Sequence, residues 1–262
     1  MVFYIAQPSV LILSQSEKET VVLHPSLHWQ HFDCIDSTNA FLLRHRDRTN
    51  QLISADRQTA GRGRRQQQWI DEGDSLLFSL VTEFSVKQDV SAWPVQVAIT
   101  LAQTLSDTTS QTLRIKWPND LYTTGVDQSM GKCAGILVES SIGQSGRMIT
   151  GVGINLSPIR CQVTTEYPIA YIDTPLDKKT LLLRLANALY LSWQTFFNHP
   201  GVNPDNFRPF DLLFNRSLIA FDSNTNKETV GTGQGINSAG QLLLLQQGNL
   251  TALTSQQRIR II

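Results

Sequence analysis

Apolar residues in this chain follow two kinds of pattern, and each pattern predicts a different element. Short continuous apolar runs bounded by polar or turn residues are typical of buried strands. They predict strands at residues 52–55, 75–84, 113–117, 133–140 and 148–156. Apolar residues at intervals of three and four are typical of a helix that packs one face on a core. That spacing predicts a helix through Val95, Ala98, Ile99, Ala102 and Leu105.

Polar residues and glycines mark where further elements begin and turn. Asp36-Ser37-Thr38-Asn39 precedes an apolar segment and offers side chains that cap a helix start. Thr174-Pro175-Leu176-Asp177 is expected to open a long helix to about Phe197, because proline suits the first turn and an acid three residues after the cap favours the N-terminus. A short helix is predicted at 205–213 and a hairpin turn at 122–132, which contains two glycines.

The pattern changes beyond Phe214. Short apolar runs at 218–221, 242–245 and 259–262 are separated by Gly, Asn and Ser, which predicts a small β-barrel of about fifty residues. We therefore predict an α+β protein, with a mixed β-sheet domain packed with helices and then a small barrel. The predicted units are a leader of one or two strands at 1–28, a domain at 29–214 and the barrel at 215–262.

Composition narrows the class of protein. The chain has 262 residues, of which 41% are hydrophobic and 17% charged, as in ordinary globular proteins. Lys plus Arg is 22 and Asp plus Glu is 22, so the net charge is zero and a strongly basic nucleic-acid binder is disfavoured. No apolar run is long enough to span a bilayer, and the apolar start, residues 1–13, lacks the basic flank of a signal peptide.

Cysteine and histidine usage indicates the compartment. Cys34, Cys133 and Cys161 are widely spaced, and an odd number without a pairing or metal-binding pattern favours reduced thiols in the cytoplasm. The five histidines form no ligand cluster with cysteine, so no metal-ligating residues are predicted. We expect a cytoplasmic protein.

The most informative chemistry lies between Arg57 and Arg65. Four arginines fall within nine residues, two glycines interrupt them, and no acid appears from Arg57 through Ile70. Arginine presents a charged planar fork that suits phosphate and carboxylate, and glycine lets backbone N–H groups approach an anion. We interpret the segment as a mobile loop that closes over a small anion. A solvated surface loop is the plain alternative, and nucleic-acid binding is a third.

Three further clusters carry candidate chemistry. Lys116-Trp117-Pro118-Asn119-Asp120 places two polar residues after a strand that proline should end, although an ordinary Asx turn explains them too. Lys132 begins an apolar strand, so its amine either projects into a cavity or is exposed at the strand end. Gly151 and Gly153 on the last strand indicate close approach of a ligand or another backbone, or tight strand packing.

Taken in order, these clusters resemble those of biotin protein ligases, also called biotin–[acetyl-CoA-carboxylase] ligases. The resemblance covers roughly residues 30–157. It rests on Ser37-Thr38-Asn39, Gln58 to Arg65 with Trp69, Lys116 to Tyr122, Gly131 to Glu139, and Gly151 to Leu156. Gly235-Ile236-Asn237 followed by Gly240 to Leu243 looks like the family's SH3-like C-terminal barrel.

The resemblance implies a two-step reaction. Biotin's carboxylate attacks the α-phosphate of ATP to give biotinyl-5′-AMP, and a lysine of the biotin carboxyl carrier protein then displaces AMP. Biotin, ATP and Mg²⁺ are the implied ligands, and domain 29–214 becomes the biotin- and ATP-binding catalytic domain. No Ser–His–Asp order or phosphate loop is present in the sequence, which fits a reaction without a protein nucleophile.

Site residues follow from the positions that match the family's motifs. Lys132, Arg64 and Arg65 are the implied catalytic residues: Lys132 meets the carboxylate and α-phosphate, and the arginines of the loop, Arg62 included, close over the adenylate. The implied biotin and adenylate contacts are Ser37, Thr38, Asn39, Gln58, Gly61, Arg62, Arg64, Trp69, Asn119, Asp120, Lys132, Gly135 and Asn155. Gln58, Ser37 and Thr38 match positions at the ureido head, and Gly61 and Gly135 are expected to let the backbone reach the ligand. Arg260 is a candidate from the barrel.

Two departures from the family pattern bear on these expectations. Gln66 stands where the family usually has a glycine after the double arginine, which bears on how the loop closes. Many bacterial members begin with a DNA-binding domain of some sixty residues, and here Ser37 already belongs to the first motif. We therefore expect the monofunctional form, which does not bind DNA. Family members are often dimers through a sheet edge, so a homodimer is a further expectation.

Other functions stay open at this stage. A lipoate or octanoate ligase would use the same adenylate chemistry, although the Lys-Trp-Pro-Asn-Asp string favours biotin. A non-catalytic biotin or nucleotide sensor, and a DNA-binding repressor, are alternatives from other classes. Comparison of biotin with lipoate, a single-turnover assay and a gel shift would separate them.

Overall fold

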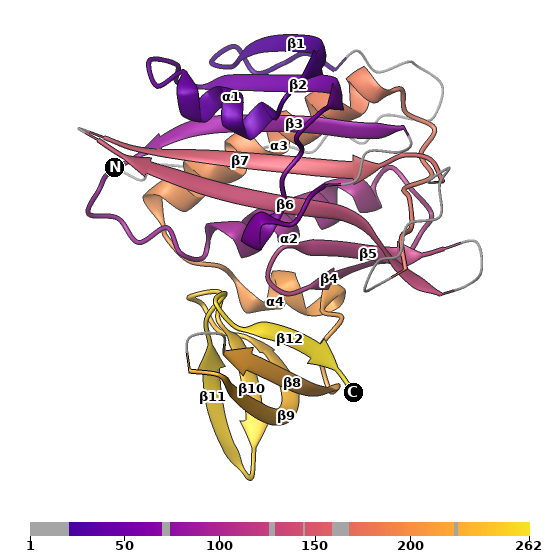
Figure 1. Ribbon diagram of the computed structural model, residues 1–262, viewed down its shortest axis with the longest axis vertical. Helices are drawn as coiled ribbons and strands as arrows, with labels where there is room; N and C mark the ends of the chain where they lie inside the picture. Colours follow the sequence, from indigo (N-terminus) through magenta and orange to yellow (C-terminus); the bar gives the residue numbers. More distant parts are fainter. Residues whose placement is uncertain (1–20, 70–73, 126–128, 144, 159–167, 223–224) are drawn as a thin grey trace, which may run out of the picture.

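The computed structural model describes residues 21–69, 74–125, 129–143, 145–158, 168–222 and 225–262. Among these residues it contains two β-sheets that lie one below the other (Figure 1). Most of the predicted leader at 1–28 lies outside the described residues, and so does Cys161. No helix within those ranges combines the length and apolar character needed to cross a membrane.

The larger sheet has seven strands in the order β1-β2-β3-β7-β6-β5-β4. Only β1 and β2 pair in parallel, and every other neighbouring pair is antiparallel. The strands are β1 (His28–Ile35), β2 (Gln51–Gln58), β3 (Ser75–Phe84), β4 (Leu113–Lys116), β5 (Asp120–Thr124), β6 (Met130–Ile142) and β7 (Gly146–Asn155).

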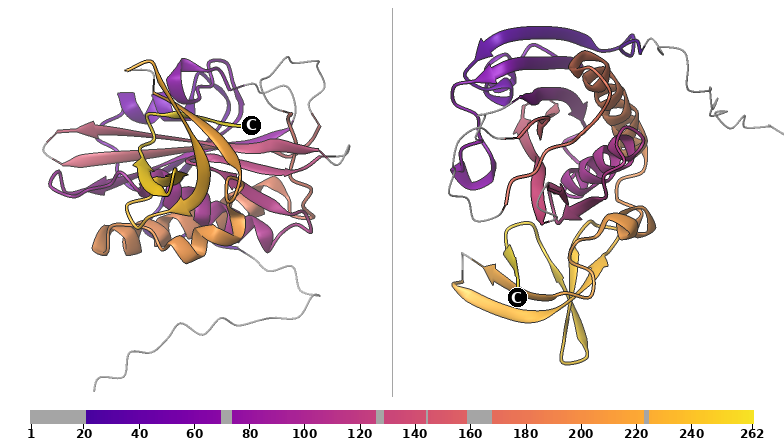
Figure 2. Two further views of the ribbon diagram at one scale, coloured as in Figure 1. Left: turned by 90° about the horizontal axis from the view of Figure 1, so that it is seen from below. Right: turned by 90° about the vertical axis from the view of Figure 1, so that its right-hand side faces the viewer.

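Helices cover the two faces of this sheet unequally. The long helices α2 (Trp93–Ser106) and α3 (Lys178–Asn198) contact each other and bury one face (Figure 2). The short α1 (Thr38–Arg44) packs on the opposite face. Successive strand residues point to opposite faces, so Leu52 joins the main core under α2 and α3 whereas Ile53 joins a small cluster with Leu42 of α1. The rest of the α1 face is left for polar groups.

The smaller sheet has five antiparallel strands in the order β11-β10-β9-β8-β12. Its strands are β8 (Ser217–Asp222), β9 (Lys227–Ile236), β10 (Leu242–Gln246), β11 (Asn249–Leu253) and β12 (Arg258–Ile261). The segment before it carries α4 (Pro204–Phe207) and the 3-10 turn η2 (Arg208–Phe210). The indole N–H of Trp117 donates to the carbonyl of Gly240 at 2.8 Å, which ties the two sheets together. This architecture confirms the α+β class with a C-terminal SH3-like barrel, and the limits 29–214 and 215–262 remain our proposed domain boundaries.

Three sequence expectations need correction. The long helix begins at Lys178, with Asp177 as its cap and not Thr174, because the Asp177 carboxylate accepts from the Thr180 N–H at 2.9 Å. The predicted helix at 205–213 is shorter, since α4 and η2 end at Phe210. Strands β1 and β5 were missed because both contain several polar residues, and the end of β5 was taken as part of a turn.

Candidate active site

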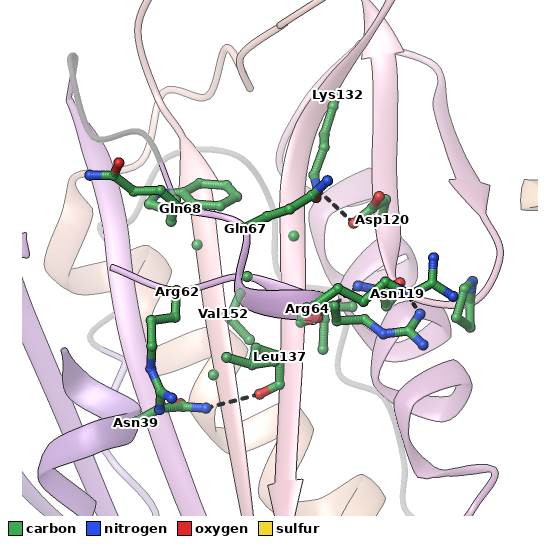
Figure 3. A pocket seen from close by; sticks show the side chains of 18 of the residues that line it. Asn39, Arg62, Arg64, Gln67, Gln68, Asn119, Asp120, Lys132, Leu137 and Val152 are labelled. Atoms are coloured by element: carbon green, nitrogen blue, oxygen red, sulfur yellow. Dashed lines mark hydrogen bonds and ion pairs between the residues drawn. The ribbon is translucent and has the colours of Figure 1, made fainter. Parts of the chain in front are cut away.

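A cavity of about 190 Å³ lies on the α1 face of the large sheet. It is bounded by the N-terminus of α1, the arginine loop (residues 61–69), the turn after β4, the centres of β6 and β7, and the start of β12. The predicted site residues that line it are Ser37, Thr38, Asn39, Gln58, Arg62, Arg64, Arg65, Trp69, Asn119, Asp120, Lys132 and Gly135. Figure 3 shows Arg62 and Arg64 reaching towards different parts of this cavity.

Three predicted residues lie outside that lining. Gly61 borders a neighbouring hollow, which the arginine loop also lines. Asn155 uses its side-chain amide structurally, because Nδ2 donates to the carbonyl of Ala170 at 3.0 Å. The barrel contributes Gln257, Arg258 and Ile259 to the cavity, and Arg260 is not among its lining residues.

One end of the cavity is built from the capped start of α1. Ser37 is the N-cap, and its hydroxyl accepts from the Ala40 N–H at 3.4 Å. Gln58, at the end of β2, accepts through Oε1 from the Thr38 N–H at 2.7 Å and lies 3.1 Å from the Thr38 hydroxyl. Ser37, Thr38 and Asn39 are all buried. The result is a compact set of amide and hydroxyl groups, which suits a neutral polar ligand group.

The opposite end carries the ammonium group of Lys132. A β-bulge between β5 and β6 makes Cys133 the extra residue, because Leu121 pairs with Ala134 and Tyr122 pairs with Lys132. Bulges re-aim side chains, and here Lys132 lies against Gly135, on the cavity side. Its Nζ is 2.7 Å from the Asp120 carboxylate and 5.9 Å from the ring centroid of Trp69. Lys132 is therefore a cavity cation and not an exposed strand-end lysine.

The bulged Cys133 points the other way, into the core. Its side chain is completely buried, and burial raises the pKa of the thiol to about 12. A thiol in that state is a weak nucleophile at neutral pH. Cys133 therefore takes no part in the site chemistry.

The arginine loop is folded inward and held at several points. Arg62 forms an ion pair with Glu139 at 3.2 Å. Arg64 donates to Asn119 Oδ1 at 3.0 Å and also to the carbonyl of Ser255, in the turn between β11 and β12. Arg65 donates to the carbonyl of Gln256 in the same turn. The barrel turn thus anchors the loop over the cavity, so the segment is not a free solvated loop.

Burial sets the electrostatics of Arg64. Burial lowers the pKa of this guanidinium from its ordinary value, repulsion by Arg65 lowers it further, and Asp120 opposes both. A guanidinium starts from so high a pKa that it stays charged at neutral pH. A buried charge that keeps part of its hydrogen-bonding capacity favours an incoming anion.

Glycines on the central strands make room for side chains. A Cβ on Gly151 would lie 2.2 Å from Asn39 Oδ1, and one on Gly153 would lie 2.7 Å from Trp69 Cε2. Gly135 faces Trp69 in the same way, with a Cβ position 2.9 Å from Cζ3. For Gly151 and Gly153 the sequence left open a ligand, another backbone or tight strand packing, and the nearest occupants are the Asn39 and Trp69 side chains.

Two residues next to the cavity were not singled out from the sequence. Ser79 is completely buried in β3, and its hydroxyl is 2.7 Å from Thr38 Oγ1 and 2.6 Å from Asn39 Oδ1. Glu139, on β6, accepts from Asn39 Nδ2 at 2.8 Å and pairs with Arg62. The signal for Ser79 was a lone hydroxyl inside the apolar run Leu76 to Val81, and buried polar groups need partners.

A separate polar cluster lies at the sheet edge. His31, Asp33 and Asp56 have ligand atoms within 4.8 Å of one another, and all three residues are exposed. His31 also contacts the Ser54 hydroxyl at 2.9 Å. Charged residues commonly protect an edge strand from pairing with another chain, and β1 is such an edge, so we assign the cluster no ligand.

Comparison with known proteins places the chain in a family. A model of the Biotin/lipoate A/B protein ligase family matches residues 31–155. The bifunctional ligase/repressor BirA of Salmonella typhimurium is 32% identical over 237 residues, which is 82% of this chain and 68% of that protein. The biotin–[acetyl-CoA-carboxylase] ligase of Mycobacterium tuberculosis is 26% identical over 82% of this chain and 84% of its own length.

Solved structures give the same result for the fold. Biotin protein ligase from Aquifex aeolicus, in complex with biotin and ATP, matches with a TM-score of 0.76 at 21% identity, covering 89% of this chain and 99% of that one. At such identity the match shows a shared fold. The sequence identity to the Salmonella protein carries the assignment further, and the chain belongs to the Biotin/lipoate A/B protein ligase family.

Proposed function

We propose that this protein is an ATP-dependent biotin–protein ligase. It forms biotinyl-5′-AMP and transfers biotin to a lysine of the biotin carboxyl carrier protein of acetyl-CoA carboxylase. One observation carries the proposal: a single cavity combines a neutral polar end at Gln58 and Thr38 with a cationic end at Lys132 and the arginine loop. The name of the Mycobacterium tuberculosis relative supports the choice of carrier.

Adenylate formation needs the cationic end of the cavity. The biotin carboxylate must approach the negatively charged α-phosphate, and two like charges about 4 Å apart repel by about 4 kcal/mol at an effective dielectric near 20. Fixed cations offset this repulsion without reorganising during the reaction. Lys132, at the cationic end, is the group we assign to both the carboxylate and the α-phosphate. Arg64 and Arg65 then hold the adenylate from the loop side.

The second step, transfer of biotin to the carrier, depends mainly on excluding water from the cavity and needs no further catalytic groups. The nucleophile is the carrier's own lysine, so the protein supplies position and a closed cavity. The arginine loop covers the cavity and is anchored to the barrel turn through Arg64 and Arg65. Closure keeps water away from the acyl-phosphate, which hydrolysis would otherwise destroy.

Mg²⁺ is the remaining proposed ligand, and the acidic side chain of the cavity fits it. Mg²⁺ prefers oxygen ligands and is commonly held by one or two carboxylates together with substrate phosphates. Asp120 is the carboxylate among the described residues that line the cavity. We propose that Asp120 holds Mg²⁺ when ATP is bound, where the ion would neutralise phosphate charge. Absence of DNA binding, a cytoplasmic location and a homodimer remain predictions.

The test uses the full chain with ATP, Mg²⁺, labelled biotin and a biotin carboxyl carrier domain. We expect label on one lysine of the carrier, and none on a carrier in which that lysine is replaced by arginine. A parallel reaction with lipoate distinguishes the two activities of the family. Preferential transfer of lipoate, or binding of biotin without any transfer, would refute the proposed function.

A further inference from the structure

A chain of side chains, buried at its centre, joins the polar end of the cavity to the arginine loop. Gln58 Oε1 lies 3.1 Å from Thr38 Oγ1, which lies 2.7 Å from Ser79 Oγ, which lies 2.6 Å from Asn39 Oδ1. The chain then continues through Asn39 Nδ2 to Glu139 at 2.8 Å and from Glu139 to Arg62 at 3.2 Å. Figure 3 shows Arg62 beside Asn39 at this end of the cavity.

The two amides in this chain have fixed orientations. A backbone N–H can only donate, so the Thr38 N–H at 2.7 Å requires an oxygen on Gln58. Asn39 Nδ2 faces two acceptors, the carbonyl of Leu137 at 3.2 Å and the Glu139 carboxylate at 2.8 Å. Its oxygen therefore faces Ser79. Both ends of the three-contact series are acceptors without protons.

Proton counting exposes a shortage. Three oxygen–oxygen contacts lie between Gln58 and Asn39, but the hydroxyls of Thr38 and Ser79 supply only two protons. Each arrangement of these protons leaves one contact without a hydrogen. Ser79 has one hydroxyl proton for two neighbouring oxygens, so it donates either to Thr38 or to Asn39. Asn39 Oδ1 receives a hydrogen bond from Ser79 only in the second case.

The tight packing around Asn39 makes the direction of the Ser79 hydrogen bond important. Ser79, Gly151 and Leu137 are register partners across β3, β7 and β6. Asn39 lies against this row, and a Cβ on Gly151 would already be 2.2 Å from its oxygen. The amide is closely confined, so its contact with Ser79 also fixes the nitrogen that holds Glu139.

We infer that Ser79 is a positioning residue that couples ligand binding at Gln58 to the placement of Arg62, an inference that rests on the proposed function. An N–H group of a cyclic urea that donates to Gln58 Oε1 satisfies this acceptor in place of the Thr38 hydroxyl. The Thr38 hydroxyl then turns to Ser79, and Ser79 donates to Asn39. Glu139 is thereby held for Arg62, and the arginine loop is stabilised over the second substrate.

The test measures coupling between the two substrates. The dissociation constant of biotin is determined by calorimetry on the full chain, with and without an ATP analogue bridged by a methylene group between the α- and β-phosphates. Coupling free energies between sites usually correspond to factors of about 5–150, so we expect at least about fivefold tightening in the wild type. Ser79→Ala should reduce that factor to within about twofold of one and change the affinity for biotin alone much less.

Ser54→Ala is the matched control, because Ser54 is also buried, lies on the neighbouring strand β2 and bonds to Trp29 and His31 outside the chain. It should keep the wild-type factor. Glu139→Gln, less buried, is a second variant: it can still accept from Asn39 but loses the charge that pairs with Arg62, so its factor should also fall. If Ser79→Ala does not fold, Glu139→Gln decides the question.

The coupling role would be overturned if the analogue tightened biotin binding to Ser79→Ala as much as to the wild type. It would also be overturned if Ser79→Ala lost biotin affinity equally with and without the analogue. Either outcome would leave the ligase function intact. A wild type that binds biotin without any coupling would do the same. A wild type that does not bind biotin would overturn the proposed function together with this inference.

Discussion

Arg64 shows how a single side chain connects the parts of the site. Its guanidinium reaches Asn119 after β4 and the Ser255 carbonyl in the barrel turn, and it lines the cavity between them. Several donors in a fixed fork allow one arginine to hold two protein groups and still face a ligand. A lysine presents a point charge without that geometry, so arginine is specifically suited to this position.

Replacement of Arg64 by glycine should separate synthesis from retention. Lys132 stays in place for the first step, so biotin-dependent pyrophosphate release should remain within about tenfold of the wild type, whereas loss of one or more charge-assisted contacts of about 1.5–3 kcal/mol each should free the adenylate. Labelling of bystander lysines measures the leak. Arg64→Lys, which keeps the charge, should leak less, and unchanged retention in Arg64→Gly would remove the proposed role.

Replacement of Lys132 by alanine should abolish the first step. A fixed donor at a site of developing charge typically contributes about 10²–10³ in rate, so biotin-dependent pyrophosphate release should fall by at least that factor. Lys179→Ala, an exposed lysine on α3, is the control. Near-normal release in Lys132→Ala would exclude Lys132 from the mechanism.

At the scale of elements, one face of β3, β6 and β7 forms the floor of the site. Leu77 and Ser79, Gly135 and Leu137, and Gly151 lie on this face, and four of them line the cavity. The opposite residues of the same strands complete the core under α2 and α3. The floor therefore includes glycines and a serine on strands that are otherwise apolar, because side chains from α1 and the arginine loop pack against it.

Replacement of Gly151 by alanine should test the packing of Asn39 on this floor. In Gly151→Ala the Cβ would overlap Asn39, and overpacking of this kind usually costs about 1–3 kcal/mol. We expect a lower free energy of unfolding in urea and weaker biotin binding. Gly143→Ala is the matched control, since its Cβ would lie no closer than 3.8 Å to its neighbours. Equal stability of the two variants would contradict the packing argument.

The sequence predicted much of this element structure, and its failures have physical causes. Strand β3 was predicted with its observed limits because its apolar residues gave a strong signal despite two serines, a threonine and a glutamate, and nine of its ten residues are buried. β1 and β5 gave no such signal, because pairing with adjacent strands stabilises them and their own sequences show no clear strand periodicity. The cap at Asp177 was misplaced because Thr174, also a capping residue, precedes a proline. The side chains brought together from α1, β3 and β6, such as Asn39, Ser79 and Glu139, meet only through long-range pairing.

At the scale of the whole molecule, the junction between the two sheets contains a largely buried carboxylate. Asp211 follows η2 and forms an isolated parallel bridge with Ile115 of β4. Burial raises the pKa of Asp211 to about 6, against the opposing effects of the Leu213 N–H and of Arg208. The charged form is therefore disfavoured in the folded protein.

This junction predicts a pH dependence of stability. The pKa of Asp211 is about 6 in the folded state against 3.8 as its ordinary value. The folded state thus binds more protons between these values, and its contribution to stability falls as pH rises from about 4 to about 6, by up to about 3 kcal/mol. Asp211→Asn should lose this part of the slope in urea unfolding, whereas exposed Asp205→Asn should keep it. Parallel profiles for all three proteins would disprove the assignment.

The barrel holds the arginine loop through the carbonyl oxygens of Ser255 and Gln256. Every amino acid carries such an oxygen, so the anchor is indifferent to which residues occupy those two positions. Its requirement is positional: the turn must have the right length and lie at the right height. Point substitutions there should have little effect, whereas insertion or deletion of one residue should break the contacts that hold the loop. Closure of the loop therefore depends on the number of residues in this turn and not on their identity.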